Sequence, residues 1–102
     1  MSNNIITLII QKGSIKNNYI SIRGHKDFFP KDSIGGKNRS MSGTKLSFDY
    51  GGGSIQKSDI DGSKSIIRRR YSHFYKHFNV KAGDTIIIER TGEKTYQIRT
   101  TD

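Results

Sequence analysis

The stretch from Tyr71 to Arg90 constrains the fold of this chain most, because a helical pattern passes directly into a strand pattern there. Its first half repeats four aromatic residues at the i, i+3, i+4, i+7 spacing of one helical face, namely Tyr71, Phe74, Tyr75 and Phe78. The following Ala82-Gly83-Asp84 is typical of a tight turn, and the β-branched run from Thr85 to Ile88 is too short for a helix but suits a buried strand. We therefore predict a short amphipathic helix, a turn and a strand, with Val80 packed in the core.

The charge of the chain is strongly unbalanced. Its 102 residues contain 18 Lys and Arg against 9 Asp and Glu, a formal net charge of +9. Such self-repulsion destabilises a small folded domain, so a polyanionic partner is the natural explanation. Two blocks, Met1 to Lys26 and Lys64 to Lys81, carry several cations and no carboxylate. Two separate positive blocks predict two contact arms.

The composition limits the class of protein. The length fits one domain with a modest core, and an apolar fraction of 31% leaves much of the surface to loops. The absence of cysteine excludes disulfides, thiolate metal sites and a cysteine nucleophile, and it is compatible with the cytoplasm, or with the nucleus in a eukaryote. Gln11-Lys12-Gly13 interrupts the apolar N-terminal run before it reaches the length of a signal core or a membrane span, so we expect a strand and no membrane association.

Short strands dominate the rest of the pattern. Seven runs have strand composition or alternation, at residues 5–10, 19–23, 44–50, 54–57, 65–70, 85–90 and 95–100. Asp27-Phe28-Phe29 is expected to open a second short helix and to place both phenylalanines in the core. The last two runs form a hairpin with Tyr96 and Ile98 facing inward. Because closing a sheet removes its unpaired edges, we predict a mainly β barrel in a single domain covering residues 1–102.

Three parts of the chain together resemble the B3-type DNA-binding pseudobarrel, a family that includes plant transcription-factor domains and DNA-reading domains of some bacterial restriction endonucleases. The matching residues near the C-terminus are Phe74, Phe78, Val80, Lys81, Gly83, Asp84, Ile86, Ile88 and Arg90. Upstream, Phe28-Phe29-Pro30 is similar to the step after the family's first helix, and Leu46 to Tyr50 is similar to its strand with alternating aromatic residues. The resemblance implies a seven-stranded open pseudobarrel with two short helices.

The resemblance also implies two arms that enter the major groove of double-stranded DNA from either side of a concave sheet face. By order along the chain, the first arm is Lys12 to Tyr19 and the second is Gln56 to Arg68. Amide side chains pair with adenine, Lys and Arg with guanine, and Asp with cytosine, while other cations hold phosphates. The candidate arm residues are Lys12, Lys16, Asn17, Asn18, Gln56, Lys57, Asp59, Lys64 and Arg68, and the candidate phosphate contacts are Arg69, Arg70, Lys76 and Lys81. We expect roughly half of them to be merely solvated, because only one face can meet the duplex.

The sequence carries no catalytic or metal signature, so we expect a protein that is not an enzyme and that needs no cofactor. A nuclease metal site needs clustered carboxylates followed by a suitably spaced lysine, and Asp84, Glu89 and Glu93 lack one. His73 and His77 have a chelating spacing but no acidic residue nearby to complete a zinc site. Asp61-Gly62 is expected to form a turn, and Asp84 is expected to cap the turn before the strand.

Two other readings of the charge stay open. A small β-barrel with Tyr19, Tyr50 or Tyr71 as stacking platforms could bind RNA or single-stranded nucleic acid. A basic barrel could also dock an acidic protein. The resemblance favours a monomer that reads double-stranded DNA, with a nuclease domain or subunit as a candidate partner.

Overall fold

The computed structural model describes residues 4–36, 39–51, 55–68 and 72–100, and this part of the chain is mainly β. A five-stranded sheet has the order β1-β8-β9-β4-β5 and a four-stranded sheet the order β2-β7-β6-β3. The strands of the first sheet are β1 (Ile5–Ile9), β4 (Leu46–Asp49), β5 (Ile55–Ser58), β8 (Thr85–Arg90) and β9 (Thr95–Thr100). Those of the second are β2 (Ile20–Ser21), β3 (Ile34–Gly35), β6 (Ile60–Asp61) and β7 (Ile66–Ile67). The mainly β prediction is confirmed, with nine strands in the described residues instead of seven.

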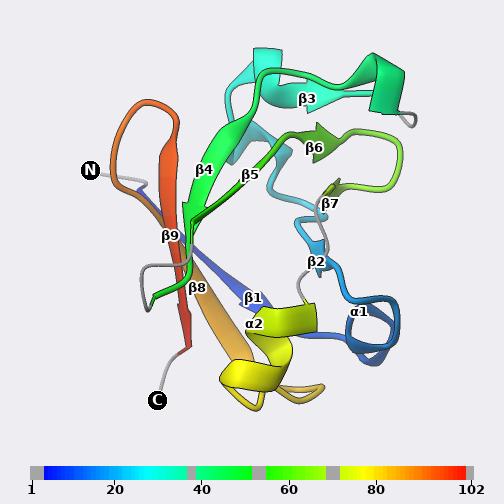
Figure 1. Cartoon of the computed structure of the whole chain (residues 1–102), viewed down its shortest axis with the longest axis vertical. Coiled ribbons are helices and arrows are strands. Elements are labelled where there is room, and N and C mark those ends of the chain that lie inside the picture. The colour runs from blue at the N-terminus through cyan, green and yellow to red at the C-terminus, as the bar shows by residue number, and fades with distance from the viewer. Residues whose placement is uncertain (1–3, 37–38, 52–54, 69–71, 101–102) are drawn as a thin grey trace.

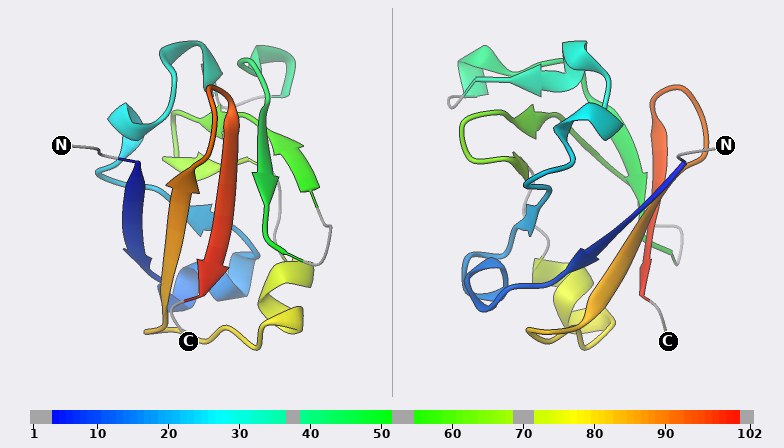
Figure 2. Two further views of the ribbon diagram at one scale, coloured as in Figure 1. Left: turned by 90° about the vertical axis from the view of Figure 1, so that its left-hand side faces the viewer. Right: turned by 180° about the vertical axis from the view of Figure 1, so that it is seen from behind.

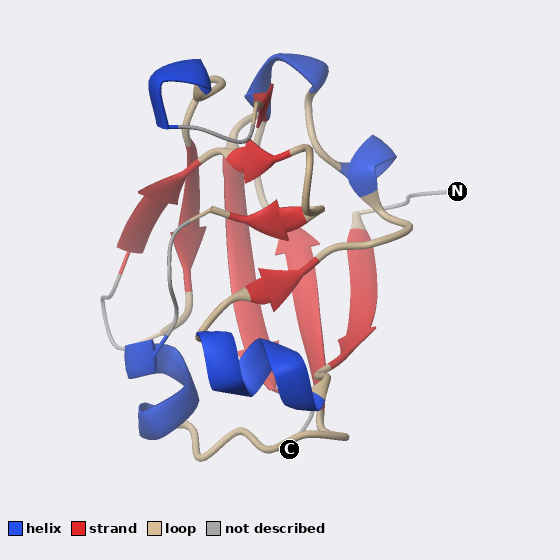
Figure 3. Cartoon of the chain, turned by 90° about the vertical axis from the view of Figure 1, so that its right-hand side faces the viewer, coloured by secondary structure: helices blue, strands red, loops and turns tan. Residues whose placement is uncertain are grey.

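The helices are short. They are α1 (Lys12–Asn17), α2 (Ser72–His77) and the single 3-10 turns η1 (Lys26–Phe28), η2 (Lys31–Ser33) and η3 (Arg39–Met41). The aromatic helix expected after Tyr71 is α2, and the helix expected at Asp27 is the turn η1. The helix α1 occupies most of the predicted first arm, Lys12 to Tyr19, which is therefore helical and not a loop between strands. Both α-helices lie at one end of the molecule, below β2 in Figure 3.

The C-terminal hairpin follows the sequence pattern closely. Strands β8 and β9 pair antiparallel with Ile88 opposite Ile98, so the alternation on the two strands is in phase. Ile86, Ile88, Tyr96 and Ile98 are all buried. The Asp84 carboxylate accepts a hydrogen bond of 2.9 Å from the Lys81 backbone N–H, which confirms the expected turn cap.

A single core lies between the two sheets. The second sheet covers one face of the first, as the two sides in Figures 2 and 3 show. Phe48 stacks on Tyr96 with ring centroids 5.4 Å apart, and Phe29 contacts Tyr96 at 5.2 Å. Phe29 is buried as expected, while Phe28 is half-buried against the core. The aromatic residues expected inside therefore join strands from distant parts of the chain.

Candidate nucleic-acid interface

An open groove of about 870 Å³ runs between the edge of the first sheet and the second sheet. Strand β1 lines one side of it, and β2 with the residues that follow lines the other. The lining residues are Thr7, Leu8, Ile9, Gln11, Gly13, Ser14, Tyr19, Ser21, Arg23, His25, Ser63, Lys64 and Ile66. The two predicted arms, residues 12–19 and 56–68, therefore both border one groove, at α1 and at the turn between β6 and β7.

The groove is cationic. Arg23 and Lys64 are exposed on its lining and His25 is half-buried, whereas none of the lining residues has a carboxylate. Lys12 and Lys16 are exposed on α1, whose Gly13 and Ser14 line the groove. Within the described residues, none of these four Lys and Arg side chains forms an ion pair. Their charge is therefore available to an anionic ligand.

The carboxylate of Asp61 builds the turn that carries Lys64. Its Oδ1 accepts hydrogen bonds from the Ser63 backbone N–H at 3.0 Å, the Ser63 hydroxyl at 2.7 Å and the Lys64 backbone N–H at 3.3 Å. Burial acts to raise the pKa of Asp61, but these hydrogen bonds and the charge of Arg68 outweigh it and lower the pKa below its ordinary value. Lys26 Nζ also donates to the Gly62 carbonyl at 2.8 Å. The expected Asp-Gly turn is confirmed. Hydrogen bonds to Asp61 within the turn and a hydrogen bond from Lys26 hold it in place.

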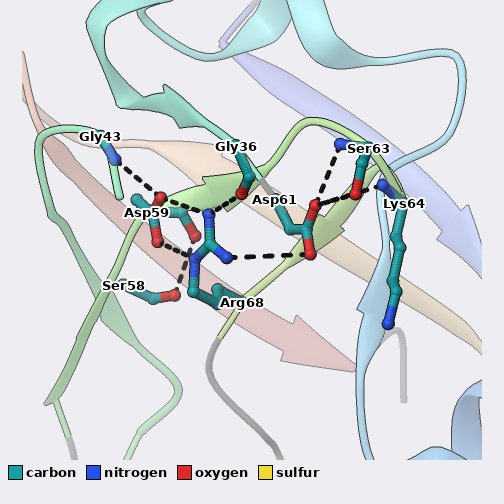
Figure 4. A network of polar contacts seen from close by, with 8 residues as sticks. All are labelled: Gly36, Gly43, Ser58, Asp59, Asp61, Ser63, Lys64 and Arg68. Atoms are coloured by element: carbon teal, nitrogen blue, oxygen red, sulfur yellow. Dashed lines mark hydrogen bonds and ion pairs between the residues drawn. The ribbon is translucent and has the colours of Figure 1, made fainter. Parts of the chain in front are cut away.

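Asp59 and Arg68 lie inside the protein and not on an arm surface, which corrects their prediction as base-reading residues. Arg68 Nε and Nη2 donate to the two oxygens of Asp59, at 2.7 and 3.0 Å. Arg68 also donates to the Gly36 carbonyl, and the Gly43 N–H donates to Asp59 at 2.8 Å (Figure 4). The hydrogen bonds that Arg68 donates to Asp59 outweigh burial and raise the pKa of Arg68 above its ordinary value. Because bare charges inside a protein must be paired, this network is structural.

Most of the first arm is the helix α1, and two of its predicted base-reading residues form hydrogen bonds with the backbone of that helix. Asn17 Nδ2 donates to the Gly13 carbonyl at 2.9 Å. Asn18 follows α1 in the left-handed conformation, with φ 58°, and its N–H donates to the Ile15 carbonyl. Asn tolerates this conformation better than most residues. Asn18 is therefore the C-cap of α1, and Lys12 and Lys16 are the cations that this arm presents.

The other predicted residues divide between two regions. Gln56 and Lys57 lie on β5, at the opposite edge of the first sheet from β1, and do not line the groove. Lys76 on α2 and Lys81 after it are exposed at the end of the molecule that also holds α1 (Figure 1). Arg69 and Arg70 fall outside the described residues, as do the side chains of His73 and His77.

Arg23 and His25 are not among the predicted site residues. Both follow the buried Ile20 and Ile22, and a strand-like alternation that ends in a cation is the signal that could have found Arg23. Tyr19 is the last residue of the predicted first arm and a candidate stacking platform. Its carbonyl accepts a hydrogen bond from the Tyr75 hydroxyl, which anchors this side of the groove to α2. Burial raises the pKa of Tyr75 above its ordinary value.

Comparison with protein-family models, with curated proteins and with solved structures found no match for this chain. None of the helices in the described residues has the length and apolar character needed to span a membrane. Within those same residues, no three His, Asp or Glu side chains gather as a metal site would require.

Proposed function

We propose that this protein is a double-stranded DNA-binding module that reads sequence through the groove between β1 and β2. One observation carries the proposal: cations from both acid-free blocks meet at a single groove, and none of them is neutralised by an ion pair in the described residues. A DNA backbone supplies phosphates at regular spacing, and each phosphate neutralised by a Lys or Arg releases counterions. The high net charge then serves binding instead of only opposing folding.

The roles of the cations follow from their positions. Arg23 lines the groove, and Lys12 and Lys16 are exposed on α1, which contributes Gly13 and Ser14 to the lining. Long side chains at these positions can follow a sugar–phosphate strand. Lys64 stands on a rigid turn, and its side chain points away from the buried carboxylates in Figure 4. A cation on a fixed support can pair with guanine N7 and O6 with defined geometry. We assign Lys64 to base reading and the other three to phosphate contacts.

We also propose that the fold is a B3-like pseudobarrel. The aromatic helix α2, the turn capped by Asp84 and the hairpin β8–β9 follow one another along the chain, and this order supports the B3-like assignment. Such a module acts by binding and not by catalysis, and it can serve as the recognition part of a restriction endonuclease or as a regulator. A nuclease domain or subunit is then its expected partner.

Selection from a random-sequence duplex library at moderate salt tests this function. A sequence-specific module enriches one motif, and Lys64→Ala relaxes the preference at one base pair of that motif. If no motif is enriched, the protein binds DNA without sequence preference at most, and the proposed sequence reading is wrong.

One observation favours a second candidate, which is binding of single-stranded nucleic acid. Tyr19 and Arg23 both line the groove, and a base can stack on a tyrosine ring while a cation holds its phosphate. Competition separates the two functions. Single strands that displace a duplex efficiently would replace the groove-reading proposal with this one.

A further inference from the structure

The outer edge of β1 is unusual for a protein of this charge. Within the described residues β1 pairs with β8 alone, so its other edge is unpaired. Natural sheets usually protect such edges with charged residues or proline. Strand β1 (IITLI) has neither, and Ile5 and Ile9 are 49% and 62% exposed. An unprotected, apolar edge is a place where another strand can add.

The backbone of β1 presents its free groups in the direction of the groove. The Arg90 N–H donates to the Asn4 carbonyl and the Ile10 N–H donates to the Asp84 carbonyl, so even-numbered residues face β8. Backbone groups alternate sides along an antiparallel strand, and those of Ile5, Thr7 and Ile9 therefore face outward. Among the hydrogen bonds of the described residues, only the Ile9 carbonyl has a partner there, the Gln11 side chain at 3.3 Å. Thr7, Leu8 and Ile9 also line the groove, so this edge borders it.

The two faces of an added strand would meet different surroundings. On the outer face its side chains would lie beside the exposed Ile5 and Ile9. On the face that Leu8 shares they would point toward the second sheet, where Arg23, His25 and Lys64 line the groove without a carboxylate. A strand that alternates apolar and acidic residues fits both faces. A duplex could not occupy the groove at the same time.

From this geometry we infer that the groove also accepts an extended peptide of alternating apolar and acidic residues, which adds to β1 as a sixth strand of the first sheet. Five residues of such a strand cover about 17 Å, enough to pair along the whole of β1. The peptide competes with DNA for Arg23 and Lys64, so it regulates DNA binding. Only this competition rests on the proposed function, because the peptide interaction itself does not require DNA.

The direct test measures binding of a peptide of alternating Val and Glu by calorimetry and amide hydrogen exchange. We expect binding that slows exchange of the Thr7 amide. The matched control is the same peptide N-methylated on the residues whose N–H groups face β1, which keeps every side chain and charge. It is expected to bind at least about tenfold more weakly, because the ladder hydrogen bonds are lost. Equal binding of both peptides would overturn the inference, since attraction would then be electrostatic only.

A protein variant gives an independent check. Thr7→Pro removes an N–H that points away from β8, so the β1–β8 ladder is retained, and proline is tolerated on an edge strand. Thr7→Val keeps the N–H and serves as its control. We expect at least about tenfold weaker peptide binding by Thr7→Pro and little change in Thr7→Val. Unchanged binding by Thr7→Pro, with its fold verified by circular dichroism, would contradict strand addition.

Competition on the unmodified protein distinguishes the two proposals. If the peptide binds and displaces a bound duplex, both stand. If the peptide binds but no duplex does, the DNA function fails and strand addition survives. If a duplex binds and the peptide does not, or if both bind together, the regulatory inference is wrong.

Discussion

Arg68 donates two hydrogen bonds to the carboxylate of Asp59, at 2.7 and 3.0 Å, while the two side chains are only 14% and 3% exposed. In the sequence, Arg68 begins the run Arg68-Arg69-Arg70 and looks like part of a solvated basic patch. The fold instead uses it to join β7 to β6 and to the loop after β3. A buried ion pair need not stabilise a protein more than an apolar pair would, but a single buried charge without its partner is costly.

Asp59→Ala is therefore expected to lower the free energy of unfolding by about 3–5 kcal/mol, because it removes the two short hydrogen bonds that pair the buried Arg68 guanidinium and leaves only the more distant Asp61 carboxylate, 3.8 Å from Nη1. The double variant Asp59→Leu with Arg68→Met replaces both charges by apolar side chains and is expected to be much closer to the parent. Urea unfolding of the single variants Asp59→Leu and Arg68→Met and of the double variant measures the difference. A double variant that loses as much as the sum of the singles would contradict the assigned pairing.

Alanine substitutions of two glycines compare the close packing around the Asp59–Arg68 pair with the open surface of α1. A Cβ on Gly35 would lie 2.5 Å from Asp59 Oδ2 and 2.6 Å from the Gly43 nitrogen and the Met41 carbonyl. Gly35→Ala is thus expected to cost about 1–3 kcal/mol of stability. A Cβ on Gly13 in α1 meets nothing within 4 Å, so Gly13→Ala is expected to gain about 0.5–1 kcal/mol. Thermal unfolding of both variants checks the opposite signs.

Alkaline pH should destabilise the protein through its buried tyrosines. Burial raises the pKa of Tyr75 and of Tyr96 above the ordinary value of 10.0, so the folded state favours the neutral phenols. This contribution is complete below the unfolded pKa and is lost as pH rises above it. Between about pH 8 and pH 11 the parent is expected to lose about 1 kcal/mol more than Tyr75→Phe. Identical losses in the urea unfolding of the two proteins would show that Tyr75 ionises freely.

Alanine substitutions of two groove cations and of one distant lysine distinguish phosphate contacts from base contacts. Arg23→Ala is expected to weaken binding to all duplexes alike and to lower the salt slope by about one unit. Lys64→Ala is expected to cost about 1–3 kcal/mol on the preferred sequence and to relax discrimination at one base pair. Lys57→Ala, on the far edge of the first sheet, is the control and should change neither property. Salt-dependent titrations that rank Lys57 with Lys64 would put the reading surface at β5 instead of the groove.

The regular parts of the fold could be predicted because local pattern and tertiary packing agree there. Both strands of the C-terminal hairpin have the predicted bounds, and the alternation that places Phe48 and Tyr50 on one face matches their burial. At α1 the local sequence pattern and the tertiary packing disagree. Gly13 and the Asn pair predict a loop, but Ser14 is buried and Ile15 packs on the core, so packing of a short helix prevails over local preference.

The candidate site could be predicted only in part, because some of its residues depend on contacts between distant parts of the chain. The acid-free blocks correctly mark Lys12, Lys16 and Lys64 as exposed, and the structure brings their segments to one groove. Which charges pair inside the protein depends on contacts between distant strands. The Asp59–Arg68 pair has no local signal, and the alternation that ends at Arg23 does not show which surface Arg23 joins.

The most direct test of the account is a titration of the isotope-labelled protein with a short duplex, followed through its backbone amide NMR signals. DNA binding through the groove predicts changes concentrated in α1, in residues 19–25 and in the turn at residues 61–65, with β4 and β5 unaffected. It also predicts that the changes weaken as salt is raised. Changes centred on β5, or none at all at moderate salt, would contradict the proposed function.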